Sequence, residues 1–198
     1  MEIELLGNKL NPSVIVIGVF HGDEPQGSYL IRMYFENNNK TSLLMLPCLN
    51  KYGFENNKRT NKNGVDLNRN FPTKNWTSGE LGDYYGGKSP SSEEETKFVI
   101  SLIDKYKPKA ILSLHSPYKV VNYDGGASGD GKKLAEKISE IINYPVEENI
   151  GYPTPGSFGT WAGIEKNIPI ITLELDENET IEKLKNPIFK IFKMLENY

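Results

Sequence analysis

Short apolar runs constrain the fold of this 198-residue chain more than any other feature of its sequence. Each run is apolar at successive positions, not only at every second one, which is typical of strands that helices cover on both faces of a sheet. The sequence therefore predicts a buried sheet. Its strands are expected at Val14–Val19, Leu43–Leu46, Ala110–Leu114 and Pro169–Leu175, with Val120–Tyr123 as a further candidate.

Helical patterns lie between these runs. We expect a first helix from Pro25 to about Phe35, because proline is favoured in the first turn of a helix. The stretch Ser91-Ser92-Glu93-Glu94 resembles a capping box at the start of a second helix. Apolar residues recur at helical spacing in Lys132–Ile142 and Ile181–Leu195. This alternation predicts one α/β domain over residues 1–198, with a mixed, mainly parallel, doubly wound sheet and helices on both faces.

Composition argues against several classes of function. The net charge of −3 offers no basic surface for nucleic acid. The longest apolar run, Val14–Phe20, is too short to span a bilayer, and Met1–Leu10 does not resemble an export signal. Cys48 is the only cysteine, which suits a reducing compartment, and we interpret it as a small core residue. We therefore expect a cytoplasmic protein that binds neither nucleic acid nor membrane.

Two long segments without periodicity, Pro47–Pro90 and Asn143–Gly159, are rich in Asn, Gly, Pro and Tyr. Loops of this length inside a compact domain are usually functional. Ligands of open α/β sheets bind at the carboxyl ends of the strands. His21 and His115 each follow a predicted strand directly, and Glu174 lies near the end of another. The sequence thus places three ionisable side chains where a site is expected.

These two histidines are the only ones in the chain, and His21 opens the stretch His21-Gly22-Asp23-Glu24. Two neutral imidazoles and one carboxylate form a zinc ligand set that leaves a fourth position for water. The same donors would also accept cobalt or nickel. Taken alone, His-x-x-Glu is a weak signal, and a histidine beside a strand is more often a hydrogen-bonded core residue. No role is assigned to Asp23.

The succession of motifs along the chain resembles the carboxypeptidase A-type zinc peptidases. The resemblance extends from about residue 14 to residue 176, and it implies a zinc carboxypeptidase-like fold. Its motifs, in order after His-x-x-Glu, are Asn50-Lys51-Tyr52-Gly53-Phe54, Arg59, Gly64–Pro72, Ser113-Leu114-His115-Ser116 and Thr172-Leu173-Glu174-Leu175. The stretch Gly64–Pro72 is the most diagnostic of them.

Within this superfamily the chain looks most like the bacterial murein peptide amidases. These enzymes cut the γ-D-glutamyl–diaminopimelate bond of small peptides derived from peptidoglycan, and they typically work in the cytoplasm, where wall peptides are recycled. The residues that carry this closer resemblance are His21–Glu24, Tyr84–Gly87 ahead of Ser92-Glu93, and Tyr152–Trp161.

The resemblance implies specific roles for eight residues. It implies that one zinc ion per chain is held by His21, Glu24 and His115. It implies that two groups act on the scissile bond, the general base Glu174 and the electrophilic helper Arg59. It implies that three residues contact the substrate, namely Asn68 and Arg69 as a clamp on a carboxylate and Tyr152 as a mobile tyrosine.

The residue types themselves support several of these roles. Glu174 lies in an otherwise apolar strand, where an unpaired carboxylate is costly; the alternative is an edge strand that turns it to solvent. The chain has only three arginines, and a planar guanidinium such as that of Arg69 suits a carboxylate better than lysine does. Arg59 and Arg69 could instead be surface residues. Tyr152 could simply pack on Pro153.

Some features limit what the resemblance implies. The chain is shorter than the digestive carboxypeptidases, and Thr160, which precedes Trp161, stands where some relatives have a residue that selects the substrate side chain. Alternatives to a murein peptide amidase therefore stay open. They are a carboxypeptidase of another specificity, an aspartoacylase-type deacylase, and a zinc-stabilised module that binds wall peptides without cutting them.

Overall fold

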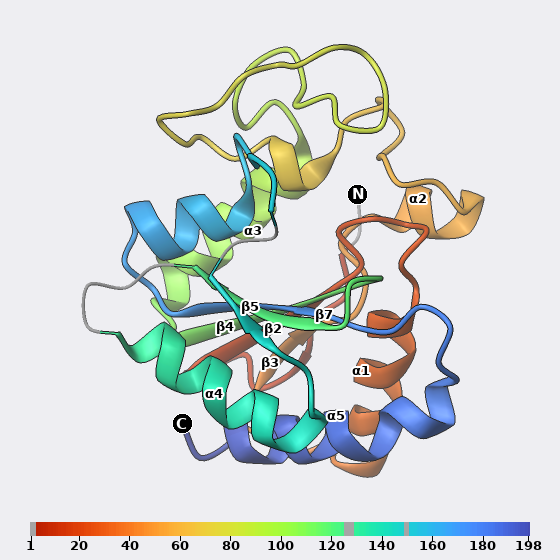
Figure 1. Cartoon of the computed structure of the whole chain (residues 1–198), viewed down its shortest axis with the longest axis vertical. Coiled ribbons are helices and arrows are strands. Elements are labelled where there is room, and N and C mark those ends of the chain that lie inside the picture. Colours follow the sequence, from red (N-terminus) through yellow and green to blue (C-terminus); the bar gives the residue numbers. More distant parts are fainter. Residues whose placement is uncertain (1–2, 125–128, 149–150) are drawn as a thin grey trace.

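The computed structural model describes residues 3–124, 129–148 and 151–198. Its strands form one seven-stranded sheet in the order β1-β3-β2-β4-β7-β5-β6 (Figure 1). Among the described strands, β1 pairs with β3 and β5 pairs with β7 in antiparallel fashion, and the other neighbours are parallel. The predicted mixed, mainly parallel sheet is confirmed. The strands are β1 (Leu6–Gly7), β2 (Val14–Gly18), β3 (Leu44–Leu46), β4 (Ala110–His115), β5 (Val120–Asp124), β6 (Val146–Glu147) and β7 (Ile170–Glu174).

Helices cover both faces of this sheet. On one face lie α1 (Gln26–Asn37), α4 (Asp130–Ile142) and α5 (Ile181–Leu195), and on the other lie α3 (Glu94–Tyr106) and the short helix η2 (Thr160–Glu165) (Figure 1). Successive side chains of a strand point to opposite faces. In β2, Val14 and Val16 accordingly join the apolar cluster of α1, whereas Ile15 and Ile17 join that of α3. Burial on both sides explains why the strand is apolar at every position.

Within the described ranges, the helices lack the length and the apolar content that crossing a bilayer requires.

The structure adds short elements that have no periodic pattern in the sequence. The edge strands β1 and β6 contain two residues each. The segment Pro47–Pro90, expected to be irregular, contains helix α2 (Lys51–Asn56) and the 3₁₀ turn η1 (Leu67–Arg69). Elements of two to six residues are too short for a hydrophobic period to be seen. They nevertheless carry parts of the site described below.

The predicted capping box at the start of α3 is wrong. Glu93 occupies the N-cap position, and no side chain caps the helix there. The Ser92 hydroxyl instead bonds to the Glu93 carboxylate at 2.6 Å. The Glu93 backbone N–H donates to Oδ1 of Asn70 at 3.1 Å. A distant asparagine thus accepts from the N-cap N–H, which in a capping box is the role of the glutamate three residues further on.

Strand register brings three strand ends to one edge of the sheet. Gly18 of β2 is level with Leu114 of β4, and His115 of β4 is level with Glu174 of β7. His21 follows β2 after a short turn. The carboxyl ends of three adjacent parallel strands therefore present the two histidines and Glu174 together, as the position of these residues in the sequence predicted.

Candidate active site

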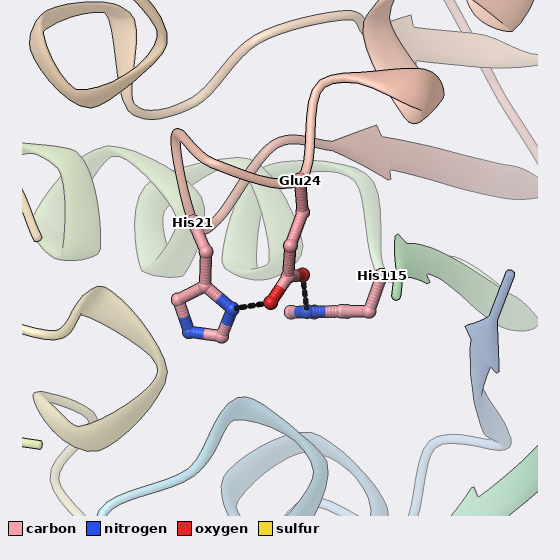
Figure 2. Close-up of side chains that lie close together, drawn as sticks. All are labelled: His21, Glu24 and His115. Carbon is pink, nitrogen blue, oxygen red and sulfur yellow. Dashed lines mark hydrogen bonds and ion pairs between the residues drawn. The ribbon is translucent and has the colours of Figure 1, made fainter. Parts of the chain in front are cut away.

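The three predicted metal ligands meet at this edge of the sheet. Figure 2 shows the Glu24 carboxylate between the two imidazoles: Oε1 lies 2.7 Å from Nδ1 of His21, and Oε2 lies 2.9 Å from Nδ1 of His115. One ligand atom from each residue lies within 4.8 Å of the others. The exposed fractions of His21, Glu24 and His115 are 3%, 9% and 4%. Three side chains, almost completely buried, thus direct one acidic and two imidazole donors at a common point.

The turn between β2 and His21 has an unusual backbone. Val19 has a φ of 53°, in the left-handed region, where a β-branched residue is a rare and strained occurrence. This turn lets Phe20 stack on the ring of His115, with centroids 5.5 Å apart and planes 18° apart. The strained residue, Val19, therefore lies in the turn that places Phe20, the neighbour of His21, against His115.

Asn50 ties the His21 loop to the segment that carries Arg59. Its amide group donates to the carbonyl oxygens of Phe20 (3.2 Å) and Arg59 (3.0 Å), and its Oδ1 accepts from the Gly53 N–H (2.9 Å). A Cβ on Gly22 would lie 1.9 Å from the carbonyl carbon of Gly53, so the two backbones meet with no room for a side chain. The motif beginning at Asn50 is therefore a scaffold for the site.

A further carboxylate, that of Asp66, stands behind the predicted ligands and had no role in the sequence interpretation. It is fully buried; Oδ1 lies 3.0 Å from Nε2 of His21, and Oδ2 accepts from Nη2 of Arg59 at 3.0 Å. Its Oδ1 also accepts from the Asn68 N–H at 2.8 Å, which caps η1. Asp66 thus orients one imidazole and one guanidinium, the arrangement by which outer carboxylates fix metal-binding histidines.

Charges in this cluster are strongly coupled. Burial by itself would lower the pKa of His21, but Glu24 and Asp66 outweigh burial and raise it to about 9. Burial would raise the pKa values of Glu24 and Asp66, but the nearby imidazole of His21 holds both well below the usual range. The site therefore concentrates two ionised carboxylates around a positive charge. A divalent cation suits this balance, and the mixed nitrogen and oxygen donors suit zinc, cobalt or nickel.

Replacing Asp66 with asparagine tests this outer support. Asparagine keeps the shape and can still cap η1, but it removes the negative charge beside His21. We expect zinc affinity to fall about 10–100-fold, as measured by competition with a chelator. Asp83→Asn is the matched control, because the Asp83 side chain is exposed and only its backbone oxygen accepts from Arg59. Equal zinc affinities for the two variants would show that Asp66 does not support metal binding.

Glu174 faces the cluster from the neighbouring strand. Its exposed fraction is 5%, and among the described residues its buried Oε2 has no hydrogen-bond partner. Burial raises the pKa of Glu174 above its ordinary value. Because an unpaired carboxylate is costly inside a protein, the geometry contradicts the alternative of a solvent-facing edge and is typical of a functional acid.

A polar cavity of about 130 Å³ adjoins the three predicted metal ligands and Glu174. It is lined by every residue to which the sequence analysis gave a role: His21, Glu24, Arg59, Asn68, Arg69, His115, Tyr152 and Glu174. Arg59 also contacts the predicted metal ligands, with Nη1 3.3 Å from Oε1 of Glu24. The two arginines are therefore not ordinary surface residues.

Hydrogen bonds near the cavity connect the two long segments, Pro47–Pro90 and Asn143–Gly159, to each other. Oδ1 of Asn68 accepts from the Phe158 N–H at 2.8 Å, and the Phe71 N–H donates to the carbonyl of Gly156 at 2.9 Å. Tyr84, a pocket residue that the sequence interpretation did not identify as such, places its ring 5.0 Å from Cζ of Arg59 and 5.8 Å from Cζ of Arg69. The most diagnostic motif and the segment before Trp161 thus form one wall.

The segment before Trp161 contains two residues that the sequence analysis singled out, Tyr152 and Thr160. Tyr152 is 40% exposed and lies beside Tyr118, with which it shares a hydrogen bond. Thr160 does not line the cavity, whereas the preceding residue, Gly159, does. The Thr160 N–H donates to the Ser157 hydroxyl at 3.1 Å, which turns the residue into the start of η2. Of these two neighbours, Gly159 is therefore the one that borders the cavity.

Asp124 at the end of β5 also lines this cavity, and burial raises its pKa from 3.8 to about 6. A carboxyl whose pKa is higher in the folded than in the unfolded state lowers stability as the pH rises through that window. The penalty at neutral pH amounts to up to about 3 kcal/mol. We expect Asp124→Asn to raise the midpoint of thermal unfolding by several degrees at pH 7.5 and to leave it unchanged near pH 4. A difference that is the same at both pH values would contradict this account.

Comparison with known proteins agrees with this geometry. The family profile of zinc carboxypeptidases matches residues 4–192. Murein peptide amidase A of Escherichia coli (strain K12) is 31% identical over 160 residues, which are 75% of this chain and 64% of that protein. Murein peptide amidase A of Vibrio campbellii is 39% identical over 158 residues, 71% of this chain and 59% of that protein. The chain thus spans less than two thirds of the length of these relatives.

A solved structure gives the same picture at the level of the fold. The crystal structure of murein-tripeptide amidase from Escherichia coli O157 superposes with a TM-score of 0.81 and 25% sequence identity, covering 96% of this chain and 83% of the other. The family profile extends over almost the whole chain, and the site contains the expected ligand set. This chain therefore belongs to the zinc carboxypeptidase family.

Proposed function

We propose that this protein is a zinc-dependent amidase that hydrolyses the γ-D-glutamyl–diaminopimelate bond of small murein-derived peptides. One observation carries the proposal: a His-Glu-His cluster, a buried carboxylate with an unpartnered oxygen and two guanidinium groups line the same cavity. The similarity to murein peptide amidases supports the class of substrate. A cytoplasmic role in wall recycling and a single catalytic domain over residues 1–198 belong to the same proposal.

One zinc ion would be held by His21, Glu24 and His115, whose donor atoms already converge. When bound, zinc lowers the pKa of a water molecule to about 7 and polarises the carbonyl of the scissile bond. Side chains of the protein carry out the proton transfers, stabilise the developing charge and bind the substrate.

Glu174 is the proposed general base. Its carboxylate takes the proton of the attacking water and later delivers it to the amine that leaves. The burial that raises its pKa makes Glu174 a stronger base, which favours the first transfer, and keeps the proton on its carboxyl group until the leaving amine takes it. The unpartnered Oε2 is free to receive the proton without breaking a bond to any other described residue.

Arg59 is the proposed stabiliser of the oxyanion that forms as water attacks the carbonyl. Asp66 holds its guanidinium through Nε at 3.2 Å and Nη2 at 3.0 Å, so that the group is oriented before the substrate arrives. Donors fixed in this way stabilise developing charge without reorganisation. Its Nη1 donates to Oε1 of Glu24 at 3.3 Å, so the guanidinium borders both the proposed metal ligands and the cavity that it lines.

Arg69 and Asn68 are the proposed clamp on the substrate carboxylate. The Arg69 guanidinium already donates to the backbone oxygen of Asn68 at 2.7 Å, and Asn68 uses its amide oxygen for Phe158. This leaves the Asn68 NH₂ group as a donor beside a fixed guanidinium, a pair that suits a carboxylate. Tyr152 is proposed to close over the bound peptide from its partly exposed position.

Product analysis by mass spectrometry tests the proposal. The zinc-loaded protein is incubated separately with L-Ala-γ-D-Glu-diaminopimelate, an α-linked peptide and N-acetyl-aspartate. We expect free diaminopimelate from the first substrate and little product from the others. Cleavage of only the α-linked peptide would identify another carboxypeptidase, and cleavage of only N-acetyl-aspartate would identify a deacylase. Peptide binding without any product under saturating zinc would identify a binding module.

A further inference from the structure

One tyrosine, Tyr84, contacts both arginines of the cavity. Its ring centroid lies 5.0 Å from Cζ of Arg59 and 5.8 Å from Cζ of Arg69. A guanidinium within about 6 Å of a ring centroid is attracted by the negative face of the ring. A single aromatic ring thus attracts two like charges that would otherwise repel each other.

The two arginines differ in how firmly other groups hold them. Arg59 forms ion pairs with two carboxylates, the closer of which is Asp66 at 3.0 Å. Arg69 forms no ion pair with any described residue, and its Nη1 donates to the backbone oxygen of Asn68 at 2.7 Å. Arg69 is nevertheless only 5% exposed. Because a buried cation without a counter-ion is costly, the ring of Tyr84 matters more to Arg69 than to Arg59.

The loop that carries Tyr84 is anchored next to the arginines. The Asp66 N–H donates to the backbone oxygen of Tyr85 at 2.8 Å. A Cβ on Gly86 would lie 2.8 Å from the backbone oxygen of Arg69, so the two backbones meet closely there. The ring of Tyr84 is therefore attached to a backbone that is fixed against the same segment that carries Asp66 and Arg69, although the residue is 59% exposed.

We propose that Tyr84 is a positioning residue that transfers the fixed placement of Arg59 to Arg69. Asp66 holds Arg59, and the ring of Tyr84 contacts both guanidinium groups. The aromatic ring has this role and the hydroxyl group does not. The inference rests on the function proposed above for what the two arginines do with a substrate, but the placement of Arg69 by the ring does not depend on it.

The Nε–H signals of arginine in heteronuclear NMR test the placement without any substrate. The chain has only three arginines, and the third, Arg32, is an internal reference, because it pairs with Glu4 at 2.7 Å. In Tyr84→Leu we expect the signals of Arg59 and Arg69 to shift, since the ring current is lost. We expect the order parameter of Arg69 to fall more than that of Arg59. Tyr84→Phe keeps the ring and is expected to keep both order parameters.

Kinetics test the consequence for substrate binding, on whichever peptide the wild-type protein cleaves. We expect Tyr84→Leu to raise KM about 5–30-fold, the range that one cation–π contact contributes, and to change kcat by less than about 3-fold. When Arg69 is already replaced by glutamine, adding Tyr84→Leu is expected to change KM by less than about 3-fold, because the ring acts through Arg69. Tyr52→Leu is the matched control, a half-exposed tyrosine on α2 that is expected to behave as the wild type.

Several results would overturn the inference. They are a wild-type order parameter for Arg69 in Tyr84→Leu, an equal loss in Tyr84→Phe, which would assign the effect to the hydroxyl group, and a rise in KM that is the same with and without the Arg69 side chain. A fall in order at all three arginines would indicate a general loosening of the fold and would overturn it as well. If the wild-type protein cleaved no peptide, the proposed function would fail, while the NMR comparison would still decide whether Tyr84 places Arg69.

Discussion

Glu174→Gln is expected to lower kcat by about 10²–10⁴-fold while the protein still binds one zinc ion per chain. Glutamine has the shape of the buried glutamate but cannot accept the proton of the attacking water. The free energy of unfolding is expected to hold or rise, since the neutral amide replaces a carboxylate whose Oε2 has no hydrogen-bond partner among the described residues. Steady-state kinetics on the γ-D-glutamyl peptide and metal analysis on the same sample measure both effects.

Glu177→Gln is the matched control for this experiment, because it makes the same chemical change three residues away on the exposed surface. It is expected to retain wild-type turnover. A Glu174→Gln variant with full activity would mean that another group removes the proton. A variant without zinc would mean that Glu174 supports the metal site and would leave the base unassigned.

Glu24→Gln is expected to abolish stoichiometric zinc binding, whereas Asp23→Asn in the same loop is expected to leave it intact. The Glu24 carboxylate contacts both imidazoles, Arg59 and the Ser116 N–H, while Asp23 is exposed. Four-ligand zinc sites have apparent binding free energies of about 10–16 kcal/mol, so one ligand accounts for about 3 kcal/mol, or more than 100-fold in affinity.

Metal content after dialysis against a weak chelator, followed by titration with zinc, distinguishes the two variants. The pair is informative because both substitutions remove one negative charge from neighbouring residues, so a change in net charge alone would affect them equally. Undiminished zinc affinity in Glu24→Gln would show that the His-Glu-His cluster is a hydrogen-bonded structural unit and not a metal centre. Loss of zinc in both variants would point to a general effect of the loop.

Much of the fold follows from local patterns in the sequence. Runs such as Val14–Gly18 are apolar on both faces because helices cover both, and α5 spans the residues Ile181–Leu195 that its apolar period predicts. The convergence of His21, His115 and Glu174 also follows, because residues at the carboxyl ends of neighbouring parallel strands must share an edge. This prediction needed only that the strands run parallel within one sheet.

The rest of the site depends on contacts that no local pattern encodes. Asp66 lies 45 positions from His21 in the sequence, and it reaches that ring only because the loop before η1 folds back over the strand ends. The position of Asp124 in the cavity depends on the antiparallel register of β5 and on Gly159, where a Cβ would lie 2.0 Å from Oδ2 of Asp124.

The reversal of direction between β7 and β5 gives the cavity a side wall. Because β5 runs back from the level of Glu174, Asp124 is level with Ile170 at the amino end of β7. Side chains two residues apart on a strand return to the same face, so Asn122 and Asp124 both line the cavity along the length of β5. A substitution at either position would therefore reshape the cavity while the strand ends that hold His115 and Glu174 stay in place.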